Sequence, residues 1–303
     1  MLITEGWDEL VRSLEDIGRL GGPIKFVPNP GNPGDALIAA ATWQLFDALK
    51  LSPRVTRIEG IGVRDVAIYG GGGALVPEYP TCARFIERCL EVNVRAAMVL
   101  SNSVRGHEDL LQRLDARFTI VCRDSASFAH ACATARNARV LMAPDLALRL
   151  DVEAVRARCS LPSVRARFLR AMTLRAESVV KGQGVRYCRW RHALSRLQIP
   201  DNGRLDILRT DKEATSPNRG DASWDISDLY GSNFRPRSEA EFIARDMLNF
   251  VQRAEAVRTD RLHVGIAAAL VGRPVTYLDN SYGKIKAIYD TSLIDVPTIA
   301  FEH

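Results

Sequence analysis

The chain has 303 residues, enough for two domains with sizeable cores, and its 47% hydrophobic and 25% charged residues are typical of a soluble globular protein. It contains no run of about 18 apolar residues, which excludes a transmembrane helix. The amphipathic N-terminus lacks the basic start and apolar centre of a signal peptide, so we expect a cytoplasmic protein. The net charge of +5 favours an anionic partner, but no nucleic-acid-binding motif accompanies it.

The six cysteines are scattered along the chain without CxxC spacing. In a protein without an export signal we expect them to be reduced, and several to pack as small apolar residues. No zinc-type spacing is present, so the sequence predicts neither a metal site nor a bound cofactor.

The first strongly patterned stretch is a βα unit. An apolar strand is predicted at Ile24–Val27, followed by a loop rich in proline and glycine and then by a helix with one buried face. Asp35 lies where this helix begins, and its carboxylate can cap the N–H groups of the first turn. A glycine-rich loop at a helix N-terminus can also hold an anion. Two interpretations stay open: a capped βα turn alone, or an anion site.

Strands and helices alternate through the first 150 residues. After the first strand, further strands are predicted at 55–58, 65–69, 96–100, 118–122 and 139–142, with helices at 1–20, 83–91 and 108–116. A further helix follows the polar run 123–127 and ends at residue 134. This alternation is typical of a parallel sheet covered on both faces, in which ligands bind at the carboxyl ends of the strands. Glycine or polar residues stand at four such ends, at 31–35, 70–73, 101–103 and 123–127.

Four consecutive glycines, Gly70 to Gly73, follow the strand at 65–69. They form neither a GxGxxG fingerprint nor a GxxxxGK[ST] loop. Backbone without side chains lets a ligand approach closely, and successive N–H groups can hold an anion. The alternative is a tight turn or close backbone packing.

A second alternation begins near residue 201. Strands are predicted at 204–209, 225–229, 256–260 and 274–278, and helices at 238–252, with an N-cap Ser238, at 264–270 and at 283–289. The arginine-rich stretch before it, residues 151–200, is predicted to be a helical connection. We therefore expect an α/β protein with two Rossmann-like, parallel-sheet halves facing a cleft, residues 1–150 and 201–303. This layout is GT-B-like, an analogy that fixes no chemistry.

Five motifs occur in order along the chain: GNPGDALI at 31–38, IYGGGGAL at 68–75, VCRDSAS at 121–127, APDLAL at 143–148 and VRTDRLHVGIAAALVGRPV at 257–275, followed by Lys284. This pattern resembles the polysaccharide pyruvyl transferase family. The resemblance implies a GT-B-like enzyme that transfers pyruvate from phosphoenolpyruvate to sugar hydroxyls as a ketal. The acceptor would be an exopolysaccharide or its lipid-linked precursor.

Phosphoenolpyruvate carries a phosphate and a carboxylate, and arginine side chains suit both groups. We expect Arg123 and Arg261 to bind this donor, one from each half. The resemblance supports Arg261 and His263 as donor-binding or catalytic, and His263 could protonate the departing phosphate. Lys284 adds charge. The remaining donor-binding candidates are Asn32 and the glycines Gly71, Gly72 and Gly73. A salt bridge to a nearby acid is the alternative role of Arg123.

Asp35 is the best candidate for the base that activates the hydroxyl, or for stabilising an oxocarbenium-like centre. Asp124 and Asp145 are weaker candidates. Aromatic side chains could stack on an acceptor sugar, although a core or surface role is the alternative for each: Tyr79, Trp190, Trp224 and Tyr230.

Two other functions remain open from the sequence. A nucleotide-sugar glycosyltransferase of the same architecture would need a carboxylate for the donor ribose, for which Glu255 and Asp279 are the candidates. A non-catalytic anion-binding protein is the third hypothesis. The arginines of residues 156–191 could hold the protein peripherally at the inner membrane through anionic lipid.

Overall fold

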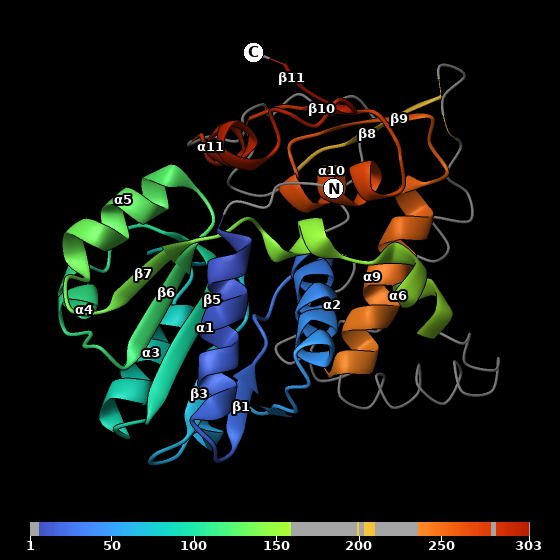
Figure 1. The fold of residues 1–303 in the computed structure, drawn as a ribbon. Helices are drawn as coiled ribbons and strands as arrows, with labels where there is room; N and C mark the ends of the chain where they lie inside the picture. Colours follow the sequence, from blue (N-terminus) through green and yellow to red (C-terminus); the bar gives the residue numbers. More distant parts are fainter. Residues whose placement is uncertain (1–5, 159–198, 200–202, 210–235, 280–282, 303) are drawn as a thin grey trace, which may run out of the picture.

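The computed structural model describes residues 6–158, 199, 203–209, 236–279 and 283–302, and it contains two parallel β-sheets (Figure 1). The larger sheet has the order β2-β1-β3-β5-β6-β7, with β4 beside β5. Its strands are β1 (Ile24–Val27), β2 (Arg54–Val55), β3 (Val66–Tyr69), β4 (Gly72–Leu75), β5 (Ala96–Val104), β6 (Phe118–Cys122) and β7 (Arg139–Met142). The α/β class with parallel sheets is thereby confirmed.

Both faces of the larger sheet are covered, because alternate residues of each strand point to opposite sides. In β3, Val66 and Ile68 join the core beneath α1 (Trp7–Arg19) and α2 (Pro33–Ala48). Ala67 and Tyr69 point to the other side. That side is covered by α3 (Thr81–Glu91), α4 (Glu108–Gln112) and α5 (Ser125–Thr134).

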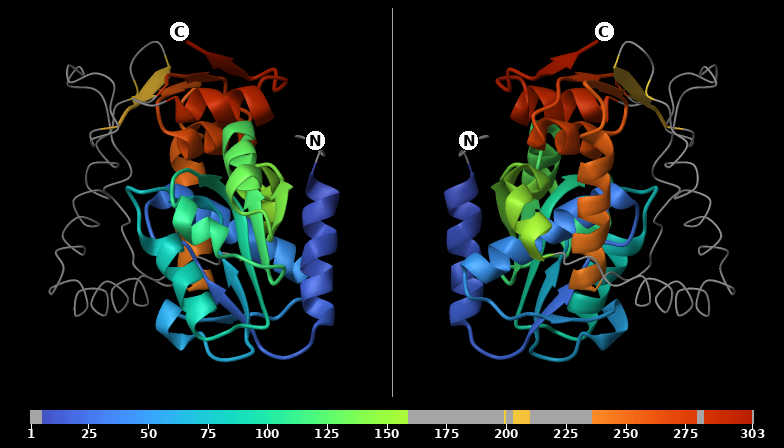
Figure 2. Two further views of the ribbon diagram at one scale, coloured as in Figure 1. Left: turned by 90° about the vertical axis from the view of Figure 1, so that its left-hand side faces the viewer. Right: turned by 90° about the vertical axis from the view of Figure 1, so that its right-hand side faces the viewer.

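The smaller sheet belongs to the C-terminal half and has the order β11-β10-β9-β8. Its strands are β8 (Arg204–Ile207), β9 (Ala256–Thr259), β10 (Val275–Tyr277) and β11 (Ile299–Phe301), and all neighbours run parallel. The helices of this half are α9 (Arg237–Val251), α10 (Leu262–Leu270) and α11 (Lys284–Ser292). Both side views show this half stacked on one end of the larger sheet, with α9 running down beside the N-terminal half (Figure 2).

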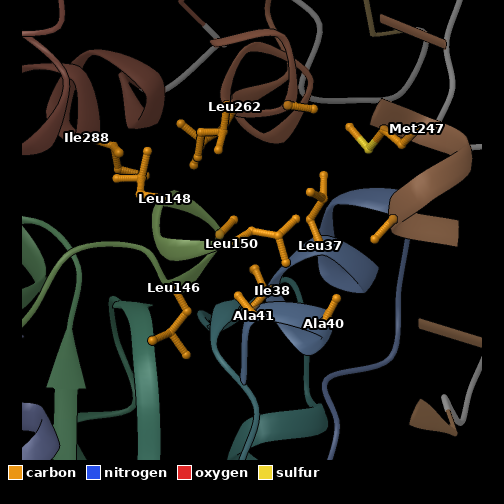
Figure 3. Packing of buried hydrophobic residues seen from close by; sticks show 14 of the residues in the cluster. Leu37, Ile38, Ala40, Ala41, Leu146, Leu148, Leu150, Met247, Leu262 and Ile288 are labelled. Atoms are coloured by element: carbon orange, nitrogen blue, oxygen red, sulfur yellow. The ribbon is translucent and has the colours of Figure 1, made fainter. Parts of the chain in front are cut away.

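One hydrophobic core runs through both halves. Helix α2 of the N-terminal half packs along α9 and also meets α10. Between them lies the short helix η2 (Leu146–Arg149), whose leucines reach the core, and α6 (Val152–Arg158) packs on α9. Figure 3 shows this junction, which includes Leu37, Ile38, Leu146, Leu148, Leu150, Met247, Leu262 and Ile288. Because this shared surface is apolar and buried, it holds the two halves together.

Ion pairs add to this junction near the C-terminus of α2. Arg237 binds Asp47 with two hydrogen bonds, Nη1 to Oδ1 at 2.9 Å and Nη2 to Oδ2 at 2.7 Å. Arg158 also contacts Asp47, and Arg156 binds Glu153. These two arginines thus make ion pairs within the protein. The other arginines that we assigned to a lipid surface lie outside the described residues.

Most predicted elements are present, but several differ. The strand predicted at 55–58 is limited to β2, and Ile58 begins the short helix η1 (Ile58–Gly60) instead. The helix predicted at 108–116 ends at Gln112. Residues 101–103 lie inside β5 and not after it, because this strand continues to Val104. Gly72 and Gly73 begin a further strand, β4, that pairs with β5. The predicted N-cap role of Ser238 is wrong, because Pro236 occupies the N-cap position and Ser238 lies within α9. Strand β11 was not expected.

Some expectations fall outside the described residues: the strand at 225–229, most of the connection at 151–200, and Cys159 and Cys188. The four described cysteines are free thiols, and three of them are buried: Cys82, Cys89 and Cys122. Burial raises the pKa of the Cys89 thiol to about 12, so this side chain stays protonated and apolar.

Candidate active site

A pocket of about 220 Å³ lies where the two halves meet. It is lined by segments that follow the carboxyl ends of strands in both sheets, as expected for parallel sheets. The N-terminal half contributes the segment from Asn29 to Asp35 after β1, together with Gly73, Ala74, Tyr79, Thr81 and Arg123. The C-terminal half contributes Arg209 after β8, Arg261 after β9, and the first residues of α10, including His263.

The first turn of α2 forms one wall of the pocket. Asn32 is the N-cap residue, and its side-chain oxygen accepts a hydrogen bond from Gly34 N at 2.8 Å. Asp35 reaches back, and its Oδ2 accepts the backbone N–H of Asn32 at 2.8 Å. The two side chains form a capping box, so the N-cap itself is Asn32 and not Asp35. Asp35 does cap a backbone N–H, as the sequence suggested, while its carboxylate also faces the pocket.

A chain of hydrogen bonds from the interior holds the other oxygen of Asp35. Asn29 Nδ2 donates to Asp35 Oδ1 at 2.8 Å, and the Tyr69 hydroxyl donates to Asn29 Oδ1 at 2.8 Å. Tyr69 is fully buried, and this burial raises the pKa of its hydroxyl well above the usual value. The hydroxyl therefore remains a donor, and the carboxylate of Asp35 is held in one orientation.

The glycines beside Asp35 lie where side chains would collide. A Cβ on Gly31 would stand 2.0 Å from Asp35 Oδ2, and a Cβ on Gly72 would stand 2.6 Å from Asn29 Nδ2. Gly71 packs against the backbone of Ser101, while Gly73 lines the pocket. Three glycines of the run, from Gly70 to Gly72, thus serve close packing, the alternative that the sequence left open.

Arg123 and His263 share one buried carboxylate, that of Asp145. Arg123 Nη1 donates to Asp145 Oδ2 at 2.6 Å, and its Nε donates to Ser103 Oγ at 2.9 Å. The same Oδ2 lies 3.3 Å from His263 Nε2, and Oδ1 accepts the backbone N–H of Ala147 at 3.0 Å. Asp145 is fully buried and Arg123 nearly so. The salt bridge foreseen as an alternative for Arg123 exists, but its partner is Asp145 and not the adjacent Asp124.

The charge of this carboxylate follows from its partners. Burial alone would raise the pKa of Asp145, but the charge and hydrogen bond of His263 and the charge of Arg123 outweigh it. The pKa of Asp145 therefore lies well below its usual range, and the group is an anion at neutral pH. An anion at this place orients the guanidinium of Arg123 and the imidazole of His263, which come from different halves, toward one pocket.

Gly34 brings His263 against the first turn of α2. A Cβ at Gly34 would lie only 2.5 Å from His263 Nδ1, 2.6 Å from its Cγ and 2.7 Å from its Cβ. Real Cβ atoms do not approach so closely, so a glycine is needed at this position. The imidazole is therefore enclosed between α2 and Asp145.

Arg261 occupies the N-cap position of α10 and is mostly buried, with 7% of its surface exposed. Its backbone N–H is bound by Thr259 Oγ1 at 3.0 Å, and its side chain makes no cap hydrogen bond to the helix. The Tyr277 hydroxyl donates to the Leu262 carbonyl at 2.6 Å and so fixes the start of α10. The first N–H groups of a helix have no partner within it, so this end favours an anion.

Comparisons with known proteins identify the family of this chain. The family model for polysaccharide pyruvyl transferase matches residues 32–282. The chain belongs to the polysaccharide pyruvyl transferase family. The resemblance seen in the motifs is thereby confirmed, and the protein is a transferase that acts on polysaccharide.

Two individual proteins are similar to this pyruvyl transferase. The "Putative pyruvyl transferase EpsO" of Bacillus subtilis (strain 168) is 24% identical, over 77% of this chain and 71% of the relative. A crystal structure of the functionally uncharacterised protein KP1_0663 from Klebsiella pneumoniae has a TM-score of 0.75. That likeness covers 99% of this chain and 100% of the other at 24% identity, and it supports the fold alone.

The structure brings most of the predicted site residues together. Asp35, Arg123, Arg261, His263, Asn32 and Gly73 all line the pocket of the pyruvyl transferase. Gly71 and Gly72 lie behind it. Lys284 is the first residue of α11, but its side chain lies outside the described residues, as do Trp190, Trp224 and Tyr230.

Three other carboxylates that the sequence suggested do not line the pocket. Asp124 caps α5 by accepting the N–H of Ser127 at 2.8 Å and does not line the pocket. The carboxylates weighed for a nucleotide ribose, Glu255 and Asp279, do not line it either.

Sequence reasoning missed Arg209 and Asn29. Arg209 was placed inside a strand, but β8 ends at Ile207, so this arginine stands after its strand just as Arg123 and Arg261 do. That shared position was the signal that could have identified it.

None of the helices in the described residues has the length and apolar character needed to cross a membrane. In the same residues, no group of three or more His, Cys, Asp and Glu side chains is placed to hold a metal ion.

Proposed function

We propose that this pyruvyl transferase takes pyruvate from phosphoenolpyruvate and attaches it as a ketal to two hydroxyls of a sugar in an exopolysaccharide or its lipid-linked precursor. The observation that carries the proposal is the convergence of Arg123, Arg209, Arg261 and His263 on one pocket. Phosphoenolpyruvate places two anionic groups close together, and such a ligand needs several cations from different directions.

The C-terminal half suits the phosphate of the donor. Arg261 and His263 flank the start of α10, where the unpaired N–H groups and the helix dipole favour negative charge. Arg123, fixed by Asp145 and Ser103, comes from the N-terminal half and suits the carboxylate. A guanidinium can bind a carboxylate with two parallel hydrogen bonds, which also sets its orientation.

The reaction would proceed in two additions at C2 of the donor. In the first, a sugar hydroxyl adds across the double bond, so that its oxygen joins C2 and the methylene carbon gains a proton. In the second, a neighbouring hydroxyl forms the other C2–O bond while the C2–O bond to phosphate breaks. In this proposal Asp35 accepts the hydroxyl proton and His263 donates a proton to the departing phosphate; both residues line the pocket.

A lipid-linked acceptor would bring the enzyme to the inner face of the membrane, so we propose a peripheral association there during catalysis. Co-sedimentation with vesicles that contain anionic lipid tests this association, with neutral vesicles as the control.

Calorimetric titration with phosphoenolpyruvate, UDP-sugars and GDP-sugars tests the donor. We expect saturable binding of phosphoenolpyruvate that is lost in Arg261→Ala and weakened in His263→Ala. Arg258→Ala is the matched control, because this arginine lies on the same strand segment but binds Glu302 at the surface. Binding of a nucleotide sugar alone would instead support the glycosyltransferase, and binding without turnover on any acceptor would support a non-catalytic protein.

A further inference from the structure

The residues that line the pocket fall into two groups by charge. Arg123, Arg209, Arg261 and His263 follow strands β6, β8 and β9, and we call this group the cationic end of the pocket. The residues contributed by β4, by the loop after it and by the start of α3 carry no charge, and we call them the uncharged end: Gly73, Ala74, Tyr79 and Thr81. A donor with two anionic groups suits the arginines, which leaves the uncharged residues for a neutral co-substrate.

Tyr79 gives this uncharged end an aromatic surface. In the described part of the chain three large apolar side chains are exposed, Val63, Tyr79 and Ile294, and Tyr79 is the member of this group that lines the pocket. Its position is fixed by a tight turn, in which Tyr79 N donates to the Val76 carbonyl at 3.0 Å. An aromatic face of this kind suits the C–H face of a sugar ring.

Polar groups stand beside this aromatic face. Thr81, the first residue of α3, lines the pocket next to Tyr79 and is half-buried. Asp35 lies within the same pocket, and its two oxygens each accept one hydrogen bond, from Asn29 and from the Asn32 backbone. A carboxylate has about four lone-pair positions, so Asp35 retains capacity for a sugar hydroxyl.

Glycines keep the carboxylate of Asp35 open to such a hydroxyl. A Cβ on Gly31 would stand 2.0 Å from Oδ2, and one on Gly72 would stand 3.2 Å from Oδ1. A side chain at either position would cover the carboxylate. The carboxylate thus stays accessible to a hydroxyl within the same pocket that holds the arginines.

We propose that the acceptor sugar lies on Tyr79 and Thr81, with its attacking hydroxyl on Asp35 and its ring turned away from the cationic end. This assignment rests on the proposed function, because it takes the cationic end to be occupied by phosphoenolpyruvate. It commits to a neutral sugar ring as the ligand of this end.

Saturation-transfer NMR tests the assignment with three probes, the methyl glycosides of glucose, galactose and mannose, added to enzyme saturated with phosphoenolpyruvate. We expect at least one glycoside to bind, and Tyr79→Ala to weaken that binding by about threefold to tenfold. Tyr79→Phe keeps the aromatic face and should bind as the wild type does. Val63→Ala, an exposed apolar residue outside the pocket, is the control.

Affinity for phosphoenolpyruvate, measured on the same variants, should stay within about twofold of the wild type, since Tyr79 carries no charge that could bind the phosphate or the carboxylate. The proposal is overturned if no glycoside binds, if Tyr79→Ala binds it normally, or if Tyr79→Ala weakens donor and glycoside alike. Failure of phosphoenolpyruvate to bind the wild type would overturn the proposed function instead. That result is read before any glycoside is added, so the two failures are distinguishable.

Discussion

Replacing Gly34 by alanine should displace His263 and thereby damage the site from the opposite half of the protein. Gly34 lies in the first turn of α2, with Asn32 as N-cap. The new Cβ would lie 2.5–2.7 Å from three atoms of His263, whereas ordinary contacts begin near 3.4 Å. The imidazole would therefore have to move by roughly 1 Å, away from its place beside Asp145.

Two opposing terms set the size of the effect on stability. Alanine in place of glycine in a helix stabilises by about 0.5–1 kcal/mol when there is room for the methyl group. Overpacking costs about 1–3 kcal/mol. We expect Gly34→Ala to lower the free energy of unfolding by about 0.5–2 kcal/mol. A charged hydrogen bond from His263 to the donor is worth about 1.5–3 kcal/mol, so phosphoenolpyruvate should bind about tenfold or more weakly.

A double-mutant cycle separates the clash from other effects. In a His263→Gly background all three of the contacting atoms are absent and the space beside Gly34 is open, so Gly34→Ala should stabilise the protein by about 0.5–1 kcal/mol. Urea denaturation measures both changes. Gly18→Ala is the matched control, because its Cβ would meet only the end of the flexible Leu51 side chain. If Gly34→Ala stabilises the wild-type protein and leaves donor affinity unchanged, the reasoning is refuted.

Three further predictions concern groups around the pocket and the junction. Asp145→Asn should lower the free energy of unfolding by about 3–5 kcal/mol in urea denaturation, because it leaves the buried charge of Arg123 without its partner. Arg237 holds the pKa of Asp47 at about 2, so this pair stabilises the protein above about pH 4 and the contribution is lost as the pH falls toward 2. Asp47→Asn should thus cost about 1 kcal/mol at pH 7, allowing for solvent screening, and nothing near pH 2. Tyr277→Phe should lower the free energy of unfolding by about 1 kcal/mol, because the Leu262 carbonyl at the start of α10 loses the hydrogen bond from the Tyr277 hydroxyl. The same change should weaken phosphoenolpyruvate binding.

Each of these predictions has a result that contradicts it. Asp145→Asn with wild-type stability would mean that Arg123 finds another partner. A stability difference between Asp47→Asn and wild type that persists at pH 2 would exclude ionisation of Asp47 as its cause. Unchanged donor affinity in Tyr277→Phe would show that the start of α10 is held in place without this hydroxyl.

Features that depend on local pattern were predictable from the sequence. Strand β6 is a mostly apolar run of five residues that Arg123 follows directly, and Arg261 comes two residues after the end of β9. In a parallel sheet the carboxyl ends share one edge, so placing these residues near a common site needed no knowledge of contacts. The same reasoning located Asp35 at the start of α2.

Features that depend on contacts between distant residues were not predictable. Asp145 and His263 are 118 positions apart, and nothing in the APDLAL motif indicates that its carboxylate serves two cations. The role of Gly34 depends on a histidine from the other half. The polar end of β5 was misplaced because two of its side chains find partners inside the protein: Asn102 Oδ1 accepts the N–H of Ala74 at 2.8 Å, and Ser103 Oγ donates to Asp124 Oδ2 at 3.2 Å. A single sequence shows the polarity of such residues but not their partners.

The central claim, that the pocket between the halves binds phosphoenolpyruvate, is tested most directly by a crystal structure of the enzyme with this donor. We predict the phosphate within hydrogen-bond distance of Arg261 and His263, and the carboxylate on Arg123. The C2 atom should face Asp35. A donor bound elsewhere on the molecule, or a pocket that stays without donor at saturating concentration, would contradict the account.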